Sequence, residues 1–218
     1  MAIIELKGVT KRYGNRTVLD KLNLSVNEGE YVAVMGASGS GKSTLLNIIG
    51  LLENFNEGEL VIDGELNVHV NSSGANRILR EKISYLFQNF ALVDDETVQY
   101  NLDLALKYVK GTKKEKKEMI SAALERVGLK GFESNKIYEL SGGEQQRTAL
   151  ARILLKPSKI VLADEPTGSL DNKNRDAILG LLKELNEQGK TIMLVTHDNY
   201  VAAQCGRIVN IDRENAAT

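Results

Sequence analysis

The chain has 218 residues, of which 42% are hydrophobic and 26% are charged. These are ordinary proportions for a globular protein and exclude global disorder. The 28 basic and 29 acidic residues leave a net charge of −1, so we expect no nucleic-acid partner held by overall positive charge. The single cysteine, Cys205, cannot form an internal disulfide, and no apolar run approaches the roughly 18 residues that span a bilayer. The N-terminus lacks the pattern of a signal peptide, so the sequence predicts a cytosolic protein.

The first predicted elements are strands. Apolar and polar residues alternate over 21–26, which is the period of a half-buried antiparallel strand. After a turn at 27–29, the continuously apolar residues 31–35 predict a strand buried on both faces. Residues 59–62 are followed by Asp63 and Gly64, which predicts a hairpin. We therefore expect an antiparallel β subdomain near the N-terminus.

The remaining elements predict an α/β core with a helical insertion. Residues from about 95 to 156 show helical periodicity and predict an inserted α-helical subdomain. Beyond it, apolar strands at 159–163 and 191–195 flank a helix at 174–186. Continuous apolar strands separated by helices predict a mainly parallel sheet that is covered on both faces. We expect residues 1–218 to form one domain of the α/β class.

A glycine-rich segment at 36–44 follows the first buried strand and precedes an apolar helix. It matches G-x-x-x-x-G-K-[ST], in which the glycines let backbone N–H groups curl around a polyanion at a helix N-terminus. We expect Lys42 to reach the β- and γ-phosphates of a nucleotide and the Ser43 hydroxyl to bind Mg²⁺. An ordinary Gly/Ser turn is the alternative. The nucleotide-binding residues predicted here are Gly36, Ala37, Ser38, Gly39, Ser40, Gly41, Lys42, Ser43 and Thr44.

Polar side chains follow several of the predicted core strands. Asp164 and Glu165 end one of them, at the sheet edge that faces the ligand crevice in open α/β folds. There Asp164 can hold Mg²⁺ and Glu165 can orient the attacking water, although two surface acids that open a loop are the alternative. His197 and Gln88 follow two other strands. His197 can donate toward the γ-phosphate, and Gln88 can meet the metal and the water.

A second anion site is predicted at Ser141-Gly142-Gly143, which precedes a helix. Its free N–H groups and the positive end of the helix dipole favour negative charge. Because one nucleotide needs only one phosphate loop, we expect this second site to complete the nucleotide site of another copy of the chain.

With these motifs the sequence resembles the ATPases of the ATP-binding-cassette (ABC) transporter family over almost its whole length. The phosphate loop matches the family's Walker A motif, residues 160–165 match Walker B with its catalytic glutamate, and residues 140–146 match the family signature. The Q-loop glutamine, the D-loop, the switch histidine and the aromatic residue that stacks on adenine are matched by Gln88, residues 169–171, His197 and Tyr13.

The resemblance implies a P-loop NTPase core and two copies that face head to tail around two ATP molecules. Glu165, His197, Lys42 and Gln88 would then be the catalytic residues, and the coupling helix of a separate transmembrane permease would dock near residues 87–100. The chain would lie on the cytoplasmic side of a bacterial membrane. The resemblance adds Tyr13, Ser141, Gly142, Gly143, Glu144 and Asp171 to the ATP-binding residues, and implies Ser43, Gln88 and Asp164 as the Mg²⁺ ligands.

Finer resemblances suggest an exporter. Residues 164–171 look most like the lipoprotein-release, macrolide-export and cell-division group, and residues 87–98 resemble bacteriocin-export ATPases of Gram-positive bacteria. The expected function is an ATP-hydrolysing subunit that energises export of a peptide or bacteriocin, a lipoprotein or an antimicrobial compound. The alternatives are a signalling ATPase coupled to a permease-like cell-division or regulatory protein without solute transport, and an ATPase that acts on the ribosome or DNA. The modest length favours a stand-alone transporter subunit.

Two segments fall outside this pattern. Residues 65–76 are polar and depart from the usual family pattern before the Q-loop. Residues 107–117 carry six lysines and are expected to be a solvated helix start, with contact to lipid head groups as the alternative.

Overall fold

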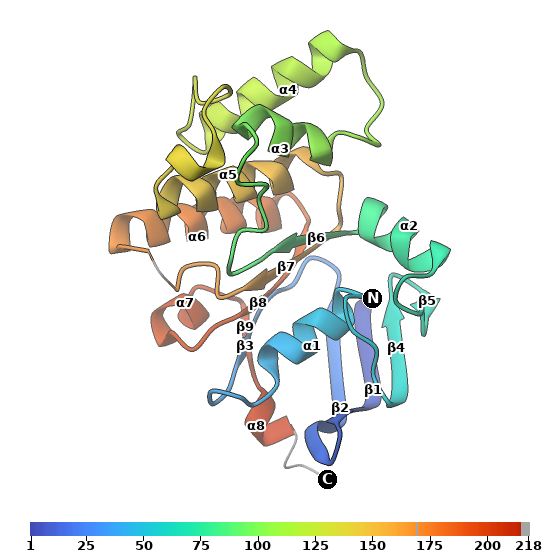
Figure 1. The fold of residues 1–218 in the computed structure, drawn as a ribbon. Helices are drawn as coiled ribbons and strands as arrows, with labels where there is room; N and C mark the ends of the chain where they lie inside the picture. Colours follow the sequence, from blue (N-terminus) through green and yellow to red (C-terminus); the bar gives the residue numbers. More distant parts are fainter. Residues whose placement is uncertain (169, 215–218) are drawn as a thin grey trace.

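The computed structural model describes residues 1–168 and 170–214, with side chains described as far as residue 212. An antiparallel sheet with the order β2-β1-β4-β5 occupies the N-terminal part (Figure 1). Asp63 and Gly64 connect β4 to β5 with φ angles of 46° and 81°, and positive φ at both positions is what a two-residue type I′ hairpin requires. The predicted hairpin is therefore confirmed. The strands are β1 (Ala2–Tyr13), β2 (Arg16–Asn27), β4 (Glu57–Ile62) and β5 (Glu65–Leu66).

A five-stranded sheet with the order β6-β7-β8-β3-β9 forms the centre, and all its neighbouring strands are parallel. Its faces are both buried. In β3, Val32 and Val34 pack toward the antiparallel sheet, whereas Tyr31 and Ala33 pack toward the helices of the opposite layer. The prediction of a mainly parallel, doubly covered sheet is confirmed. Its strands are β3 (Tyr31–Met35), β6 (Ile83–Leu86), β7 (Ile160–Asp164), β8 (Thr191–Val195) and β9 (Arg207–Asn210).

Helices cover the two faces of this sheet (Figure 1). Helix α1 (Lys42–Ile49) packs between the two sheets. On the other face lie α5 (Gly142–Leu155) and α6 (Asn172–Glu187), and α3 and α4 pack outside α5. The other helices are α2 (Ser73–Glu81), α3 (Val98–Ala105), α4 (Lys113–Arg126), α7 (Asn199–Ala203), α8 (Ile211–Glu214) and the 3₁₀ turn η1 (Ile137–Glu139). None of the described helices is both long and apolar enough to cross a membrane.

Helix α2 lies where the sequence showed only a polar departure from the family pattern. The Ser72 side chain caps it by accepting from the Ala75 N–H at 3.1 Å, and only Ala75 and Ile78 of the helix are buried. The helix is short and mostly polar, and its first residues belong to the polar segment 65–76. This helix places Leu79 and Arg80 beside β6.

Candidate nucleotide site

The glycine-rich loop leads into helix α1 without a side-chain cap. Its N-cap residue, Gly41, has φ 96° and offers no side chain to the first-turn N–H groups. By contrast, Thr112, Ser141 and Asp171 cap α4, α5 and α6 with their side chains. A Cβ on Gly41 would lie 2.8 Å from Val18 Cγ1, so the position excludes larger residues. The open N-terminus of α1 is therefore suited to an anion.

Two side chains of the loop point to a polyanion. Lys42 Nζ donates hydrogen bonds to the carbonyl oxygens of Gly36 and Ala37, both at 2.8 Å. Ser40 Oγ is buried and has no hydrogen-bond partner among the described residues. Buried polar atoms normally have a partner, so the orphaned hydroxyl and the lysine amine, which is held only by backbone carbonyls, fit a loop that closes around phosphates.

The predicted metal ligands Ser43, Gln88 and Asp164 lie close to one another. Ser43 Oγ donates to Asp164 Oδ1 at 3.2 Å, and Gln88 and Asp164 line the same hollow of about 620 Å³. Burial at the end of β7 raises the pKa of Asp164, and the neighbouring Glu165 adds to this rise, against the opposing effect of the Ser43 hydroxyl.

These donors are all oxygens, which fits Mg²⁺. Among the described residues no group of three His, Cys, Asp or Glu side chains could hold a metal by itself. A Mg²⁺ ion at this place would therefore take its remaining oxygens from water and phosphate, as Mg²⁺ commonly does in nucleotide sites.

Glu165 and His197 meet at the carboxyl ends of β7 and β8. His197 Nδ1 lies 2.8 Å from Glu165 Oε1, and Thr196 Oγ1 donates to Glu165 Oε2 at 3.4 Å. Glu165 has φ 44°, a left-handed conformation that non-glycine residues rarely adopt. Such strain is commonly found at functional sites. Thr196 was not among the predicted residues, because only the tertiary structure brings its hydroxyl to Glu165.

Glu165 and His197 border one cleft of about 610 Å³ together with Gln88 and much of the phosphate loop. Tyr13 stands at its edge and is 48% exposed, so its ring is accessible to a flat ligand. Arg16 also lines the cleft and was missed by the sequence reasoning. In the sequence, the signal that could have indicated Arg16 is its positive charge three residues after Tyr13, the residue predicted to stack on adenine. The predicted residues that line the cleft are Tyr13, Ser38, Gly39, Gly41, Lys42, Ser43, Thr44, Gln88, Glu165 and His197.

The structure places the second predicted anion site away from this cleft. Ser141 and Glu144 form a capping box at the start of α5: the Glu144 carboxylate accepts from the N–H and the hydroxyl of Ser141 at 2.8 and 2.7 Å. Asp171 likewise caps α6 by accepting from the Asn174 N–H at 2.9 Å. Ser169, in the expected D-loop, lies outside the described residues. The ATP-binding residues added by the resemblance that do not line the cleft are Ser141, Gly142, Gly143, Glu144 and Asp171.

The ABC transporter family profile matches residues 19–168, more than half of the chain. The chain belongs to the ABC transporter family. Its resemblance to the ABC ATPases, inferred from the motifs, is thereby confirmed.

Relatives of the cassette include export proteins. It is 43% identical to the macrolide export ATP-binding/permease protein MacB of Escherichia coli, over 96% of this chain and 33% of the relative. It is 40% identical to the pyoverdine export ATP-binding/permease protein PvdT of Pseudomonas fluorescens, with the same coverage. The chain thus spans about a third of the length of these curated relatives.

Solved structures confirm the fold of the cassette. The dimeric structure of MJ0796, a bacterial ABC transporter cassette, superposes with a TM-score of 0.88 at 42% identity, covering 95% of this chain and 93% of the other. A second dimeric structure of MJ0796, in a post-hydrolysis state bound to ADP and Pi, gives a TM-score of 0.87 at 41% identity with the same coverage.

Proposed function

We propose that this ABC ATPase energises a membrane export system from the cytoplasmic face of a bacterial membrane. The observation that carries the proposal is the single cleft that Lys42, Gln88, Glu165 and His197 line together. The similarity to cassettes of export proteins supports the direction of transport. The exported compound belongs to the peptide, lipoprotein or antimicrobial classes.

Each residue of the cleft has a separate role in the hydrolysis of ATP. Tyr13 receives the adenine, and the N–H groups at the start of α1 and Lys42 hold the phosphates. Glu165 positions a water in line with the γ-phosphate, and its short contact with His197 fixes the direction of the carboxylate. His197 and Lys42 then stabilise the charge that develops on the γ-phosphate oxygens.

Ser43, Asp164 and Gln88 would hold the metal ion. Mg²⁺, when bound, offsets negative charge on the β- and γ-phosphates. Burial around Asp164 raises its pKa and so opposes its charged form. A cation at this site would reverse that effect, because opposite charge favours ionisation.

Two copies of the chain would form the complete enzyme. The residues at the start of α5, which the sequence predicts as a second anion site, do not line the cleft of their own chain. In a head-to-tail dimer, Ser141, Gly142 and Gly143 of one chain would close over the γ-phosphate held by the other. The similarity to the dimeric MJ0796 cassette supports this arrangement.

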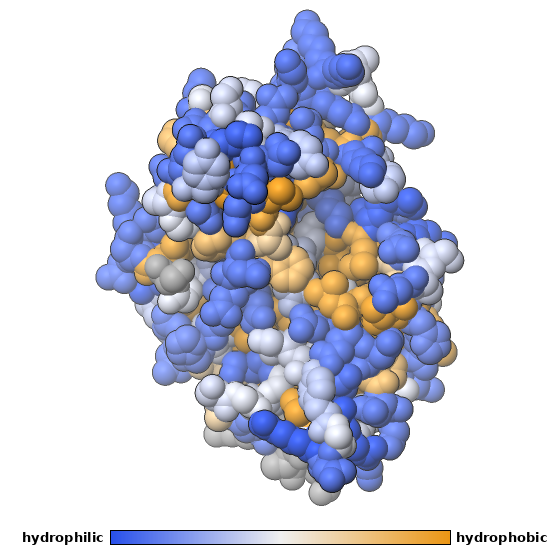
Figure 2. Space-filling model, in the orientation of Figure 1, coloured by the Kyte–Doolittle hydropathy of each residue, from blue (hydrophilic) through white to orange (hydrophobic). Residues whose placement is uncertain are grey.

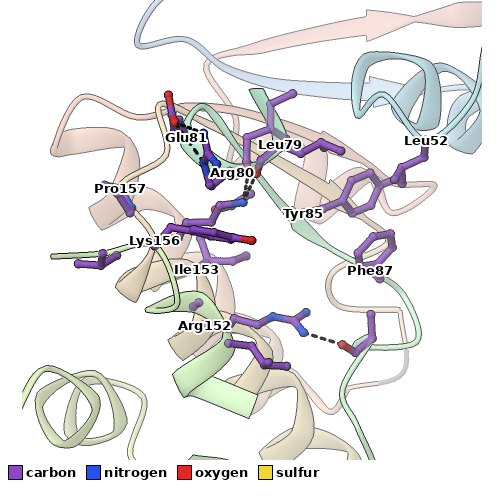
Figure 3. Close-up of a pocket in the computed structure, with 17 residues that line it drawn as sticks. Leu52, Leu79, Arg80, Glu81, Tyr85, Phe87, Arg152, Ile153, Lys156 and Pro157 are labelled. Carbon is purple, nitrogen blue, oxygen red and sulfur yellow. Dashed lines mark hydrogen bonds and ion pairs between the residues drawn. The ribbon is translucent and has the colours of Figure 1, made fainter. Parts of the chain in front are cut away.

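We further propose that the helical region 95–156 is the subdomain that contacts a transmembrane permease. A groove beside the Gln88 loop has the apolar lining that a coupling helix needs (Figure 2, Figure 3). Of the expected segment 87–100, Phe87 and Ala91 line this groove, whereas Tyr100 does not, and the rest of the lining comes from α2, α3, α5, β6 and the residues that follow α1, α3 and α5. Docking there would join ATP-driven closure of the dimer to movement of the permease.

The test is ATP turnover and oligomeric state in matched variants. Glu165→Gln should bind ATP, lose turnover and elute as a dimer in ATP, because the nucleotide stays intact between the two chains. Glu187→Gln, an exposed residue at the end of α6, should behave as the wild type. A Glu165→Gln variant that hydrolyses ATP at the wild-type rate would refute the assignment of Glu165. A monomer in ATP would refute the shared sites.

A further inference from the structure

The chain beyond β9 returns to the phosphate loop. Strands β3 and β9 are parallel neighbours, and Met35, the last residue of β3, pairs with Asn210, the last residue of β9. Beyond this pair the phosphate loop and helix α8 leave the same end of the sheet side by side (Figure 1). Ala37 and Asp212 each lie two residues further along the chain, so the register of the two strands brings them together.

The start of α8 packs directly on the first residue of the loop. Ile211 is buried in the same hydrophobic cluster as the apolar residues of α1. A Cβ on Gly36 would lie 2.6 Å from Ile211 Cγ2 and 3.3 Å from Asp212 Oδ1. The backbone of the loop therefore approaches α8 so closely that Gly36 has no room for a side chain. This packing fixes where the Asp212 carboxylate can lie.

A carboxylate of α8 binds one backbone N–H of the phosphate loop. The Ala37 N–H donates to Asp212 Oδ2 at 2.8 Å. The Asp212 N–H donates in turn to Asn210 Oδ1 at 3.0 Å, which holds the turn between β9 and this carboxylate. Because the acceptor is charged, the bond from Ala37 is stronger than one between two neutral groups. The end of β9 is thus tied to the loop by a specific polar contact as well as by packing.

The same peptide group also holds Lys42. The C=O of Gly36 and the N–H of Ala37 belong to one peptide unit, and in a trans peptide these two groups point in opposite directions. Asp212 binds this unit at its N–H, and Lys42 Nζ donates to its oxygen at 2.8 Å. The amine also donates to the Ala37 oxygen at 2.8 Å. A rotation of the peptide plane would therefore break the bond to Asp212 and the bond to Lys42 together.

The charges at the two ends of this arrangement reinforce each other. A carboxylate at the N–H polarises the peptide, so that the Gly36 oxygen becomes a better acceptor for the Lys42 ammonium group. An ammonium group has three N–H donors, and two of those on Lys42 are engaged here. One donor is left for a phosphate oxygen. The peptide thus keeps the amine at the loop before any nucleotide arrives, and Asp212 keeps the peptide in place.

We propose that Asp212 is a positioning residue for Lys42, which it holds through the Gly36–Ala37 peptide. This inference rests on the proposed hydrolysis of ATP and adds to that site a residue outside the cleft, since Asp212 is not part of the cleft lining. A loop that is ordered before binding loses less entropy when ATP binds. Loss of Asp212 should therefore weaken ATP binding. It should leave the chemical step largely unchanged, because Glu165 and His197 stay in place.

Chemical labelling of Lys42 tests the arrangement without nucleotide. The full chain is treated briefly with acetic anhydride, and the acetylation of each lysine is measured by mass spectrometry. Asp212→Ala should increase the labelling of Lys42 about threefold or more, because the amine loses a fixed acceptor. Asp212→Asn should stay close to the wild type, because its amide oxygen can still accept from the Ala37 N–H. Lys173, an exposed residue on α6, is the internal reference, and Asp20→Ala, at an exposed position of β2, is the control variant.

Steady-state turnover of the same variants tests the consequence for the reaction. Asp212→Ala should raise KM for ATP about fivefold, which corresponds to the loss of one hydrogen bond. Its kcat should change by less than about twofold, since no group that touches the reacting atoms is altered. Asp212→Asn should keep KM near the wild-type value, and Asp20→Ala should keep both constants. The affinity for ATP, measured directly on each variant, should follow KM.

Unchanged labelling of Lys42 in Asp212→Ala would overturn the proposal, even if the variant were less stable, because a purely structural residue would not move this readout. Tighter ATP binding in Asp212→Ala would also overturn it, since the carboxylate would then oppose the nucleotide. A fall in kcat at unchanged KM would place Asp212 in the chemical step instead. If Asp212→Ala increases the labelling of Lys42 but the wild-type chain does not hydrolyse ATP, the proposed function is refuted and the positioning of Lys42 by Asp212 stands.

Discussion

Replacement of Glu165 by glycine is expected to leave a more stable fold than its replacement by alanine. Glu165 has φ 44°, where Cβ of an L-residue crowds the following carbonyl oxygen at a cost of roughly 1–2 kcal/mol. Glycine avoids this cost but loses about 0.5–1 kcal/mol more backbone entropy on folding than alanine. Both variants lose the same carboxylate contacts with Thr196 and His197. The difference leaves about 1 kcal/mol in favour of Glu165→Gly.

The assay is urea unfolding of both variants without nucleotide. Ala122→Gly provides the matched control, because Ala122 is an exposed residue inside α4, where glycine should cost about 0.5–1 kcal/mol relative to alanine. Glycine in place of alanine is thus expected to raise the free energy of unfolding at position 165 and to lower it at position 122. If Glu165→Gly is no more stable than Glu165→Ala, the backbone at the end of β7 is not strained and the reasoning fails. Both variants should lack ATP turnover.

Three further predictions concern other parts of the molecule. Asn101 is fully buried and exchanges hydrogen bonds of 2.8 and 3.2 Å with the backbone of Val93, so Asn101→Leu should lower the free energy of unfolding by about 2–3 kcal/mol; a loss below about 1 kcal/mol would contradict this account. Gly41→Ala should destabilise the chain by about 1–3 kcal/mol more than Gly39→Ala, because both residues have positive φ but only Gly41 lacks room for a Cβ; equal losses in thermal unfolding would show that the loop relaxes. The pKa of Lys156 is about 8 in the folded chain, below its usual value, so the folded state releases this proton before the unfolded state does, and the stability contributed by Lys156 rises with pH above about 8. Lys156→Met should remove that rise when unfolding is compared at about pH 7.5 and about pH 9.5, and an unchanged pH dependence would refute the burial of this amine.

The sequence predicted the central sheet more accurately than its surroundings. The buried strands Tyr31–Met35 and Thr191–Val195 have the predicted bounds, because a strand covered on both faces must be apolar at every position. Helix α2 was missed because its first residues were taken as part of the polar segment 65–76. A helix of nine residues also has only about two turns over which its period can be read.

Sequence reasoning could propose site residues where the chemistry depends on local sequence. The phosphate loop, Asp164 and Glu165 could be placed because each follows directly from a strand. Arg16 could not, because only the fold brings it to the cleft, and Thr196 could not, because its contact with Glu165 joins the ends of two separate strands. The positive charge of the groove beside the Gln88 loop was also beyond sequence reasoning, since Arg80 and Arg152 come from distant helices and only the fold brings them together.

Helix α5 connects the signature residues 140–146 at its start to the groove at its end. Near its first turn, the buried Gln146 donates to the carbonyl oxygen of Pro166 at 2.7 Å, and near its end Arg152 and Lys156 hold the Gln88 loop and the start of β6. Its 14 residues make a rod of about 21 Å. A rod pinned at both ends tilts as a unit instead of bending. If a permease docks at the groove as proposed, a displacement delivered there would reach the start of α5 through a rod of fixed length, and the length of this one helix would set how far the signature residues move.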